Sequence, residues 1–185
     1  MECREFFETN AENDKICKAL QDLPLDVLLT WESLSASEHS PGPVENDENL
    51  VRYWHNPIHY DQSTGLLTPT AVDDVASHGL SVNREEHLAL AQILQQAKER
   101  VERINQKALG KPVRSMAGHS TFSALEIREF LAGLPVARRA LAVYDVAEKD
   151  DKSHAVICQI VSNKQDARSV RSQLRELANG RLKLV

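Results

Sequence analysis

The sequence predicts an α+β fold: a compact single domain whose mainly antiparallel or mixed sheet is packed by helices, with a short N-terminal helical appendage. The chain has 185 residues, of which 42% are hydrophobic and 26% are charged, a composition that can build a core of useful size. Apolar runs at 140–146 and 155–161 flank a short charged segment, as in a buried antiparallel hairpin. Helical patterns are interspersed with short strand-like segments, and no repeat of about 20–50 residues occurs, which excludes a solenoid.

Composition along the chain predicts three parts: an N-terminal helical appendage at 1–34, a linker at 35–49 and an α+β domain at 50–185. In the appendage, Ile16, Leu20 and Leu23 have helical spacing, whereas residues 25–31 fit either another helical turn or a strand. Residues 35–49 are rich in Ser, Pro, Asn and acidic side chains, which is typical of a linker. We therefore expect few long-range contacts in the linker and a domain that folds without its first thirty-odd residues.

The domain should begin with a strand, a turn and a short helix. Residues 49–55 cluster β-branched and aromatic side chains, and Pro57 should end this strand because it cannot donate to a ladder. Residues 61–65 predict a turn. The pair Thr68–Pro69 supplies an N-cap and a first helical residue, and Gly79 closes a helix of two or three turns.

The longest helix follows a brief strand at 80–82. Asn83 and Glu86 have the spacing of a capping box at its start. The apolar residues that follow keep a three-four period until Gly110, where the helix should stop. Residues 111–118 predict the next strand.

The end of the chain predicts two helices around the hairpin. Ser123 and Glu126 repeat the capping-box spacing, and the helix that they start should end at Gly133. Residues 164–180 carry apolar side chains on one helical stripe, and residues 181–185 form a last strand or tail.

Charge and cysteine usage restrict the class of protein. The net charge is −5 and the pI about 5.8, so a nucleic-acid partner is not expected. We expect no signal peptide and no membrane span, because the N-terminus is acidic and no apolar run approaches about eighteen residues. The sequence therefore predicts a cytoplasmic protein. Its three cysteines lack metal-site spacing and predict reduced thiols at Cys3, Cys17 and Cys158.

Residues 50–61, LVRYWHNPIHYD, hold several candidate functional side chains. His55 and His59 have the spacing of two metal ligands on a helix, but Pro57 argues against that helix, so we predict no metal and no cofactor. His55 should hydrogen-bond locally or help to bind a ligand. Arg52 lies on a strand lined by aromatic residues, where it either pairs with a carboxylate or clamps an anionic ligand.

We expect Arg52 to lie close to His154. The hairpin strand that begins at His154 is the most apolar candidate to pair near Arg52. If both side chains point into one concavity, Arg52 supplies a permanent charge and His154 an acid or base, with Glu148 or His55 assisting.

Basic residues follow one face of the last predicted helix. Arg171 and Arg175 are candidates for binding an acidic partner, and the alternative is that they belong to a solvated face.

The order of Arg52, the run Ser120–Ser123 and Glu148 resembles the Arg, Ser-Thr-Ser, Glu order of ADP-ribosyltransferase domains. The resemblance implies an enzyme in which Arg52, Ser120 and Glu148 share a site. The chain departs from those domains in lacking their paired glutamates or Gln-x-Glu signature. The capping box of Ser123 and Glu126 is a second explanation for the hydroxyl run.

A second resemblance covers about residues 50–161. The stretches LVRYWHNPIHYDQSTGLLTPTAV, GLSVNR, EIREF and YDVAEKDDKSHAVI resemble a widespread set of small bacterial proteins. These share an Arg-bearing strand, a Leu-Ser-Val strand and an Asn-Pro-Ala-His-Ala hairpin, whereas this chain has Asp-Lys-Ser-His-Ala in the hairpin. The resemblance implies a single bacterial domain, marks Arg52, Ser81 and His154 for testing, and implies no activity.

Two functions follow as expectations. The first is a cytoplasmic bacterial interaction or regulatory protein that binds another protein, as an accessory component of a defence or toxin-related system. It rests on the amphipathic elements and on the absence of a complete catalytic motif. The alternative is an enzyme that acts on a nucleotide-like or phosphorylated substrate through Arg52 and His154. The sequence leaves the oligomeric state open.

Overall fold

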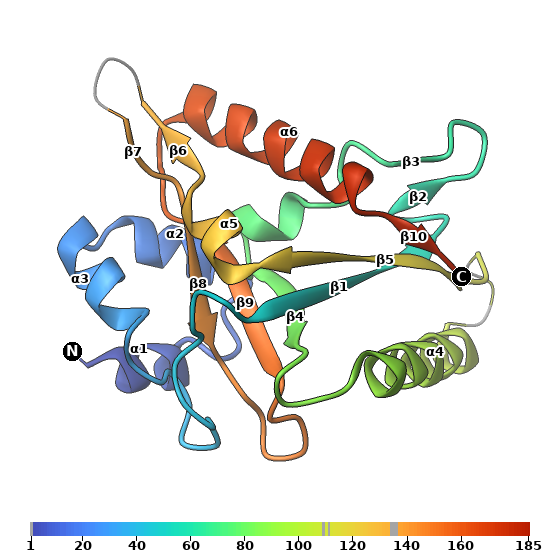
Figure 1. The fold of residues 1–185 in the computed structure, drawn as a ribbon, viewed down its shortest axis with the longest axis horizontal. Coiled ribbons are helices and arrows are strands. Elements are labelled where there is room, and N and C mark those ends of the chain that lie inside the picture. Colours follow the sequence, from blue (N-terminus) through green and yellow to red (C-terminus); the bar gives the residue numbers. More distant parts are fainter. Residues whose placement is uncertain (1, 109, 111, 134–136) are drawn as a thin grey trace.

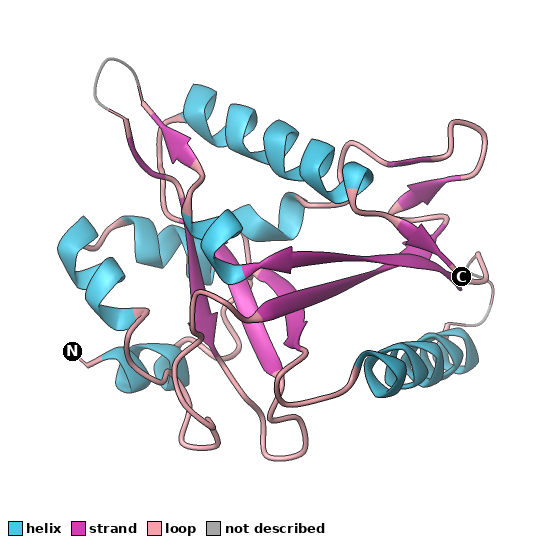
Figure 2. Ribbon diagram, in the orientation of Figure 1, coloured by secondary structure: helices cyan, strands magenta, loops and turns pink. Residues whose placement is uncertain are grey.

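A six-stranded antiparallel sheet organises the fold (Figures 1 and 2). The structure, a computed structural model, describes residues 2–108, 110, 112–133 and 137–185. The strand order is β10-β5-β1-β4-β9-β8, and each neighbouring pair is antiparallel. The strands are β1 (Asn49–Asn56), β4 (Leu80–Arg84), β5 (Ser115–Ser123), β8 (Leu141–Asp145), β9 (His154–Gln159) and β10 (Lys183–Leu184). The predicted α+β class with a mainly antiparallel sheet is confirmed.

Helices and two small hairpins surround this sheet. The hairpins pair β2 (Tyr60–Asp61) with β3 (Leu66–Leu67) and β6 (Leu131–Ala132) with β7 (Arg138–Arg139). The helices are α1 (Cys3–Thr9), α2 (Ile16–Gln21), α3 (Leu25–Trp31), the 3₁₀ turn η1 (Asp73–Ala76), α4 (Leu90–Lys107), α5 (Ala124–Arg128) and α6 (Lys164–Gly180).

The two faces of the sheet are covered differently (Figure 1). On one face, α6 and η1 pack over a large apolar cluster that includes Trp54 and Ile157. On the other face, α4 packs on β1 and β5, while α1, α2 and α3 pack on β8 and β9. Alternation along β9 divides its side chains accordingly, with Ile157 in the first cluster and Val156 in the second. The strip of β4 and β9 between α4 and the N-terminal helices carries the candidate site.

The N-terminal helices are a cover for the sheet. Their apolar faces place Phe7, Leu20 and Trp31 in one buried cluster with Tyr144 and Val156 of the sheet. The rings of Phe7 and Tyr144 pack against each other at an interplanar angle of 52°, with centroids 5.1 Å apart. Residues 25–31, which fit two interpretations by sequence, form α3.

The segment 35–49 is bound to the sheet. Ala36 donates its backbone N–H to the Asp145 carbonyl at 3.1 Å, and the Ser37 hydroxyl donates to the Ala147 carbonyl at 2.5 Å. The expectation of few long-range contacts is therefore wrong, because backbone and hydroxyl groups of this polar segment find partners on β8 and its following turn. Whether residues 50–185 fold alone stays a prediction, which these contacts weigh against.

A buried ion pair closes the same segment onto β4. Arg84 donates to both carboxylate oxygens of Glu48 at 2.6 and 2.7 Å, and both side chains are almost fully buried. Asp145 lies 3.5 Å from the same guanidinium, yet burial outweighs this charge and raises the pKa of Asp145 to about 6. Removal of one partner would leave a buried charge unpaired.

Two predicted helix starts are wrong. The helix expected from Thr68 to Gly79 is only the short turn η1, since the Thr68 hydroxyl donates to the Ile58 carbonyl in place of capping. Asn83 belongs to β4, where its amide donates to Ser153 and Asp151, so α4 begins later at Leu90.

Two further boundaries are wrong: the helix expected to end at Gly133 ends at Arg128, and the strand expected at 111–118 begins at Ser115, with Lys111 outside the described residues. Three other local predictions are confirmed. The Ser123–Glu126 capping box starts α5, the antiparallel hairpin is β8–β9, and the last helix is α6. Within the described ranges, none of the helices combines the length and apolar character that a membrane span needs.

Candidate active site

The strip between α4 and the N-terminal helices contains a polar cleft of about 350 Å³. The strand β4 contributes Ser81 and Asn83 to its floor, and β9 contributes His154. The turn before β9 and one face of α4 form its walls. The cleft exists because α4 and the N-terminal helices cover different halves of this face and leave a gap between them, with the half-buried Ser81 at its base.

Ser81 and His154 form the central contact of the cleft. The Ser81 Oγ lies 2.8 Å from the His154 Nε2. The register pairs Ser81 with Val156 and Asn83 with His154 on adjacent antiparallel strands, so both side chains leave the sheet on the same face. His154 is about one-fifth exposed at its side chain, which leaves the pair accessible from the cleft.

Glu148 lies on the other side of the imidazole. Its carboxylate is 3.4 Å from the His154 Nδ1, and its side chain is mostly exposed. The imidazole holds the pKa of Glu148 below its ordinary value, so the carboxylate is charged at neutral pH. The serine hydroxyl therefore lies at one imidazole nitrogen and the Glu148 carboxylate lies near the other, although the Nδ1 makes no hydrogen bond within the described residues.

The turn that carries Glu148 is held to β4. The Asp151 carboxylate accepts hydrogen bonds from the backbone and hydroxyl of Ser153 and from the Asn83 amide. A backbone bridge between Glu148 and Asp151 closes the turn. The amide that the sequence suggested as a helix cap thus positions the loop beside the imidazole.

Arg52 contacts Ser81 from the opposite face of the sheet. Its guanidinium donates to the Ser81 carbonyl at 2.9 Å and lies 3.8 Å from the Asp74 carboxylate. The side chain leaves β1 on the same face as Trp54, whose ring lies 5.3 Å from the guanidinium carbon. The expectation that Arg52 and His154 point into one concavity is therefore wrong: the two residues meet Ser81 at its carbonyl and its hydroxyl respectively.

His55 lies outside the cleft, beside Tyr53 on β1. It is buried, and neither ring nitrogen has a hydrogen-bond partner in the described part of the chain. Burial lowers the pKa of His55 to about 4, and burial also lowers the pKa of the stacked His59 to about 3. His55 is a neutral packed side chain here, in place of the expected ligand-binding group.

The Ser120 side chain lies on the face of the sheet that α6 covers, and its hydrogen bonds are all made there. Its hydroxyl accepts a hydrogen bond from the Trp54 indole and donates to the Ala178 carbonyl of α6, both at 2.8 Å. Arg52 and Ser120 are register partners on β1 and β5, but Glu148 lies in the cleft on the other face. The site implied by the ADP-ribosyltransferase resemblance is therefore not assembled.

The basic residues of α6 form no cleft with His154. Arg171 lies 3.2 Å from the Asp73 carboxylate and donates to Gln159, which attaches α6 to η1 and β9. The Arg175 Nε is buried with no partner in the described residues. Their role in binding an acidic partner stays a prediction.

Several residues that line the cleft were not predicted as site residues from the sequence. Tyr53, Asn83, Arg100 and Arg103 line the cleft, and the turn adds Asp150. The one available signal was the spacing of Arg100 and Arg103, which puts both on one face of the longest helix.

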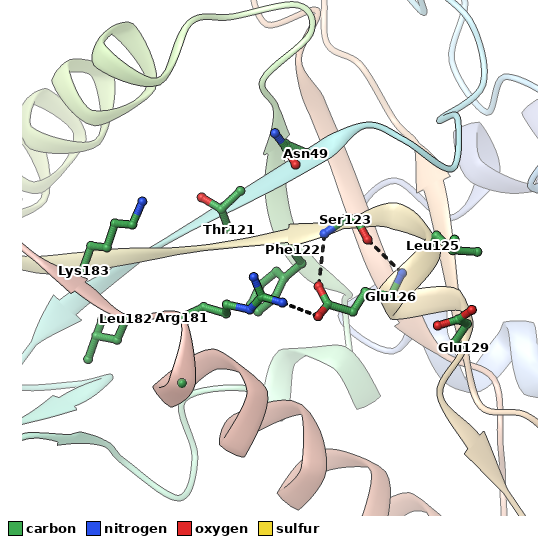
Figure 3. Close-up of a pocket in the computed structure, with 11 residues that line it drawn as sticks. Asn49, Thr121, Phe122, Ser123, Leu125, Glu126, Glu129, Arg181, Leu182 and Lys183 are labelled. Carbon is green, nitrogen blue, oxygen red and sulfur yellow. Dashed lines mark hydrogen bonds and ion pairs between the residues drawn. The ribbon is translucent and has the colours of Figure 1, made fainter.

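A larger hollow, about 740 Å³, lies between β5, α5 and the end of α6 (Figure 3). Three of its polar side chains are already paired: Glu126 closes the capping box with Ser123 and lies 2.6 Å from Arg181. No histidine or cysteine is among the described residues that line it. Volume alone therefore does not identify the reactive site.

The described side chains also include no cluster of three or more His, Cys, Asp or Glu residues placed to hold a metal ion. No protein-family model, no curated protein and no solved structure matches this chain, so its chemistry has to be argued from the cleft.

Proposed function

We propose that this protein is a hydrolase in which Ser81 is the nucleophile, His154 the general base and Glu148 the group that orients the imidazole. The observation that carries the proposal is the 2.8 Å contact between the Ser81 Oγ and the His154 Nε2, with Glu148 facing the Nδ1. A nucleophile, a base and an orienting third group in this order are what nucleophilic catalysis by serine requires.

The reaction would pass through an acyl-enzyme. As the Ser81 Oγ attacks the carbonyl carbon of an ester or amide, its proton moves to the His154 Nε2. The imidazolium then gives this proton to the leaving oxygen or nitrogen, and the acyl group stays on the Oγ. Water, deprotonated by the same imidazole, releases the acid and restores the serine. Glu148, ionised at neutral pH, stabilises the imidazolium in both halves.

This proposal develops the enzymatic alternative of the sequence analysis, with Ser81 replacing Arg52 in the reacting group. The bacterial interaction role, the cytoplasmic location and the protein partner stay predictions from the sequence, since no described contact bears on them.

Labelling with a fluorophosphonate probe tests the proposal. Attack by the Ser81 Oγ on phosphorus releases fluoride, and the proton passes to His154. We expect one covalent adduct, located at Ser81 by mass spectrometry of the peptides. Ser81→Ala and His154→Ala should each lower the labelling rate at least a hundredfold.

Ser77→Ala is the matched control. The Ser77 Oγ also lies near an imidazole, at 3.4 Å from the His78 Nδ1, and Asp74 lies 3.6 Å from the other nitrogen. That contact is longer and joins neighbouring residues on an exposed turn, so Ser77→Ala should label normally. An adduct at Ser77, or none on the folded wild-type protein, would contradict the proposal.

A further inference from the structure

The two walls of the cleft differ in charge. Arg100 and Arg103 line it from α4, where a spacing of three residues puts them on one helix face. The turn before β9 lines it from the other side with Glu148, Asp150 and Asp151. A ligand in the cleft therefore meets two guanidinium groups and the Glu99 carboxylate on the α4 wall and three carboxylates on the other.

The arginines are available to a ligand. Both are exposed, and neither forms an ion pair with a described side chain. Arg100 makes only a long hydrogen bond, at 3.4 Å, to the Tyr53 hydroxyl. Guanidinium groups bind carboxylates and phosphates through paired hydrogen bonds, so this wall suits an anionic group.

The opposite wall has one uncommitted carboxylate. Glu148 faces His154, and Asp151 accepts hydrogen bonds from Asn83 and Ser153. Asp150 has neither an ion pair nor a side-chain hydrogen bond among the described residues, and it suits a cationic group.

The balance of charge selects the ligand class. With Glu99 on α4, four carboxylates line the cleft against two guanidinium groups. A polyanion such as a nucleoside triphosphate would be repelled by this excess of carboxylates. A molecule with one group of each sign would satisfy both walls.

We infer that the cleft binds a small dipolar, peptide-like molecule. Its carboxylate binds Arg100 and Arg103, its ammonium group faces Asp150, and the bond between them lies over Ser81. The volume of about 350 Å³ is at the lower end of the range for small-molecule sites, which fits two or three amino-acid residues. The cleavage of that bond rests on the proposed function, whereas the binding does not.

The test separates binding from chemistry by using the full-length Ser81→Ala variant. Trialanine is titrated in four forms: free, N-acetylated, C-amidated and blocked at both ends, with binding followed by NMR. We expect the free peptide to bind at least tenfold more tightly than the doubly blocked one, with the singly blocked forms between them.

Charge reversal assigns the walls. Arg103→Glu in the same background should weaken the forms with a free carboxylate about tenfold and leave the C-amidated form unchanged or tighter. Lys98→Glu is the matched control, because it makes the same charge change on α4 outside the cleft and should alter none of the affinities.

Equal affinity for the four forms, or no saturable binding of any, would overturn the inference even if Ser81 is labelled. Charge-dependent binding without labelling of Ser81 would instead contradict the hydrolase and leave the ligand class standing.

Discussion

The two faces of the sheet each carry a hydrogen-bonded serine, and the two serines have different roles. On the face under α6, the Ser120 hydroxyl joins the Trp54 indole to the Ala178 carbonyl and is fully buried. On the other face, the Ser81 hydroxyl joins an imidazole at the floor of an open cleft. One serine completes a packed interface, and the other keeps a reactive partner and access to solvent. The difference follows from the packing: α6 covers its face, whereas α4 and the N-terminal helices leave a cleft between them that reaches Ser81 of β4.

The largest expected effect comes from removing one of the covers. A chain without residues 2–34 would expose Tyr144, Val156 and Cys158 and lose the burial of several large side chains. At roughly 1.5–3 kcal/mol for each side chain, the loss approaches the whole stability of an ordinary domain. We expect no cooperative urea transition for this truncated chain.

Leu20→Ala is the milder form of the same experiment. Leu20 is wholly buried in this cover, and the substitution should lower the free energy of unfolding by about 2–5 kcal/mol. A truncated chain that unfolds with the wild-type midpoint would show that the N-terminal helices are dispensable, as the sequence alone suggested.

The same contrast shows which features of the fold and the site can be predicted from local sequence patterns. The Ser123 capping box, the β8–β9 hairpin and the α6 stripe depend on neighbouring residues, and all three were predictable. Asn83 looked like a helix cap, but β9 pairs beside it and supplies Ser153 as a partner for its amide. No spacing rule brings together residues 81, 148 and 154, because strand register places them. His154 and Glu148 were candidates by residue type and Ser81 by the resemblance, whereas the contact between Ser81 and His154 follows only from that register.

The next largest effect is a loss of protein stability in acid, through the buried His55 on the face that α4 covers. Folding lowers the pKa of His55 from an ordinary 6.5 to about 4. Between pH 4 and 6.5, His55 is therefore protonated in the unfolded chain and neutral in the folded chain. Stability is therefore lost as the pH falls from 6.5 to 4, by at most about 3 kcal/mol for this residue. Asp145 acts in the opposite direction, because its pKa is raised to about 6 in the folded chain. Its protonation increases the free energy of unfolding as the pH falls from 6 towards 4.

His55→Gln isolates the histidine contribution. Urea unfolding at several pH values should give a smaller loss between pH 6.5 and 4 for the variant than for the wild type. Identical pH slopes would show that His55 titrates normally and that this part of the face is open to water.

Arg52→Lys should have a smaller effect. Lysine cannot reproduce the planar group that donates to the Ser81 carbonyl while lying over Trp54, and we expect a loss of about 1 kcal/mol. Since Arg52 does not line the cleft, fluorophosphonate labelling should continue. A variant with wild-type stability and no labelling would assign Arg52 to the reaction and remove the division between the faces.

The most direct test compares Ser81→Ala with Ser120→Ala, measuring the free energy of unfolding and the labelling rate for both. Ser120→Ala leaves the Trp54 N–H unpaired and removes one of the two donors to the Ala178 carbonyl, so it should cost about 1–3 kcal/mol while labelling persists. Ser81→Ala should lower stability by about 0.5–1.5 kcal/mol, the contribution of one part-buried hydrogen bond, and abolish labelling. Equal labelling of the two variants, or labelling lost only in Ser120→Ala, would contradict the assignment of the chemistry to Ser81 and His154.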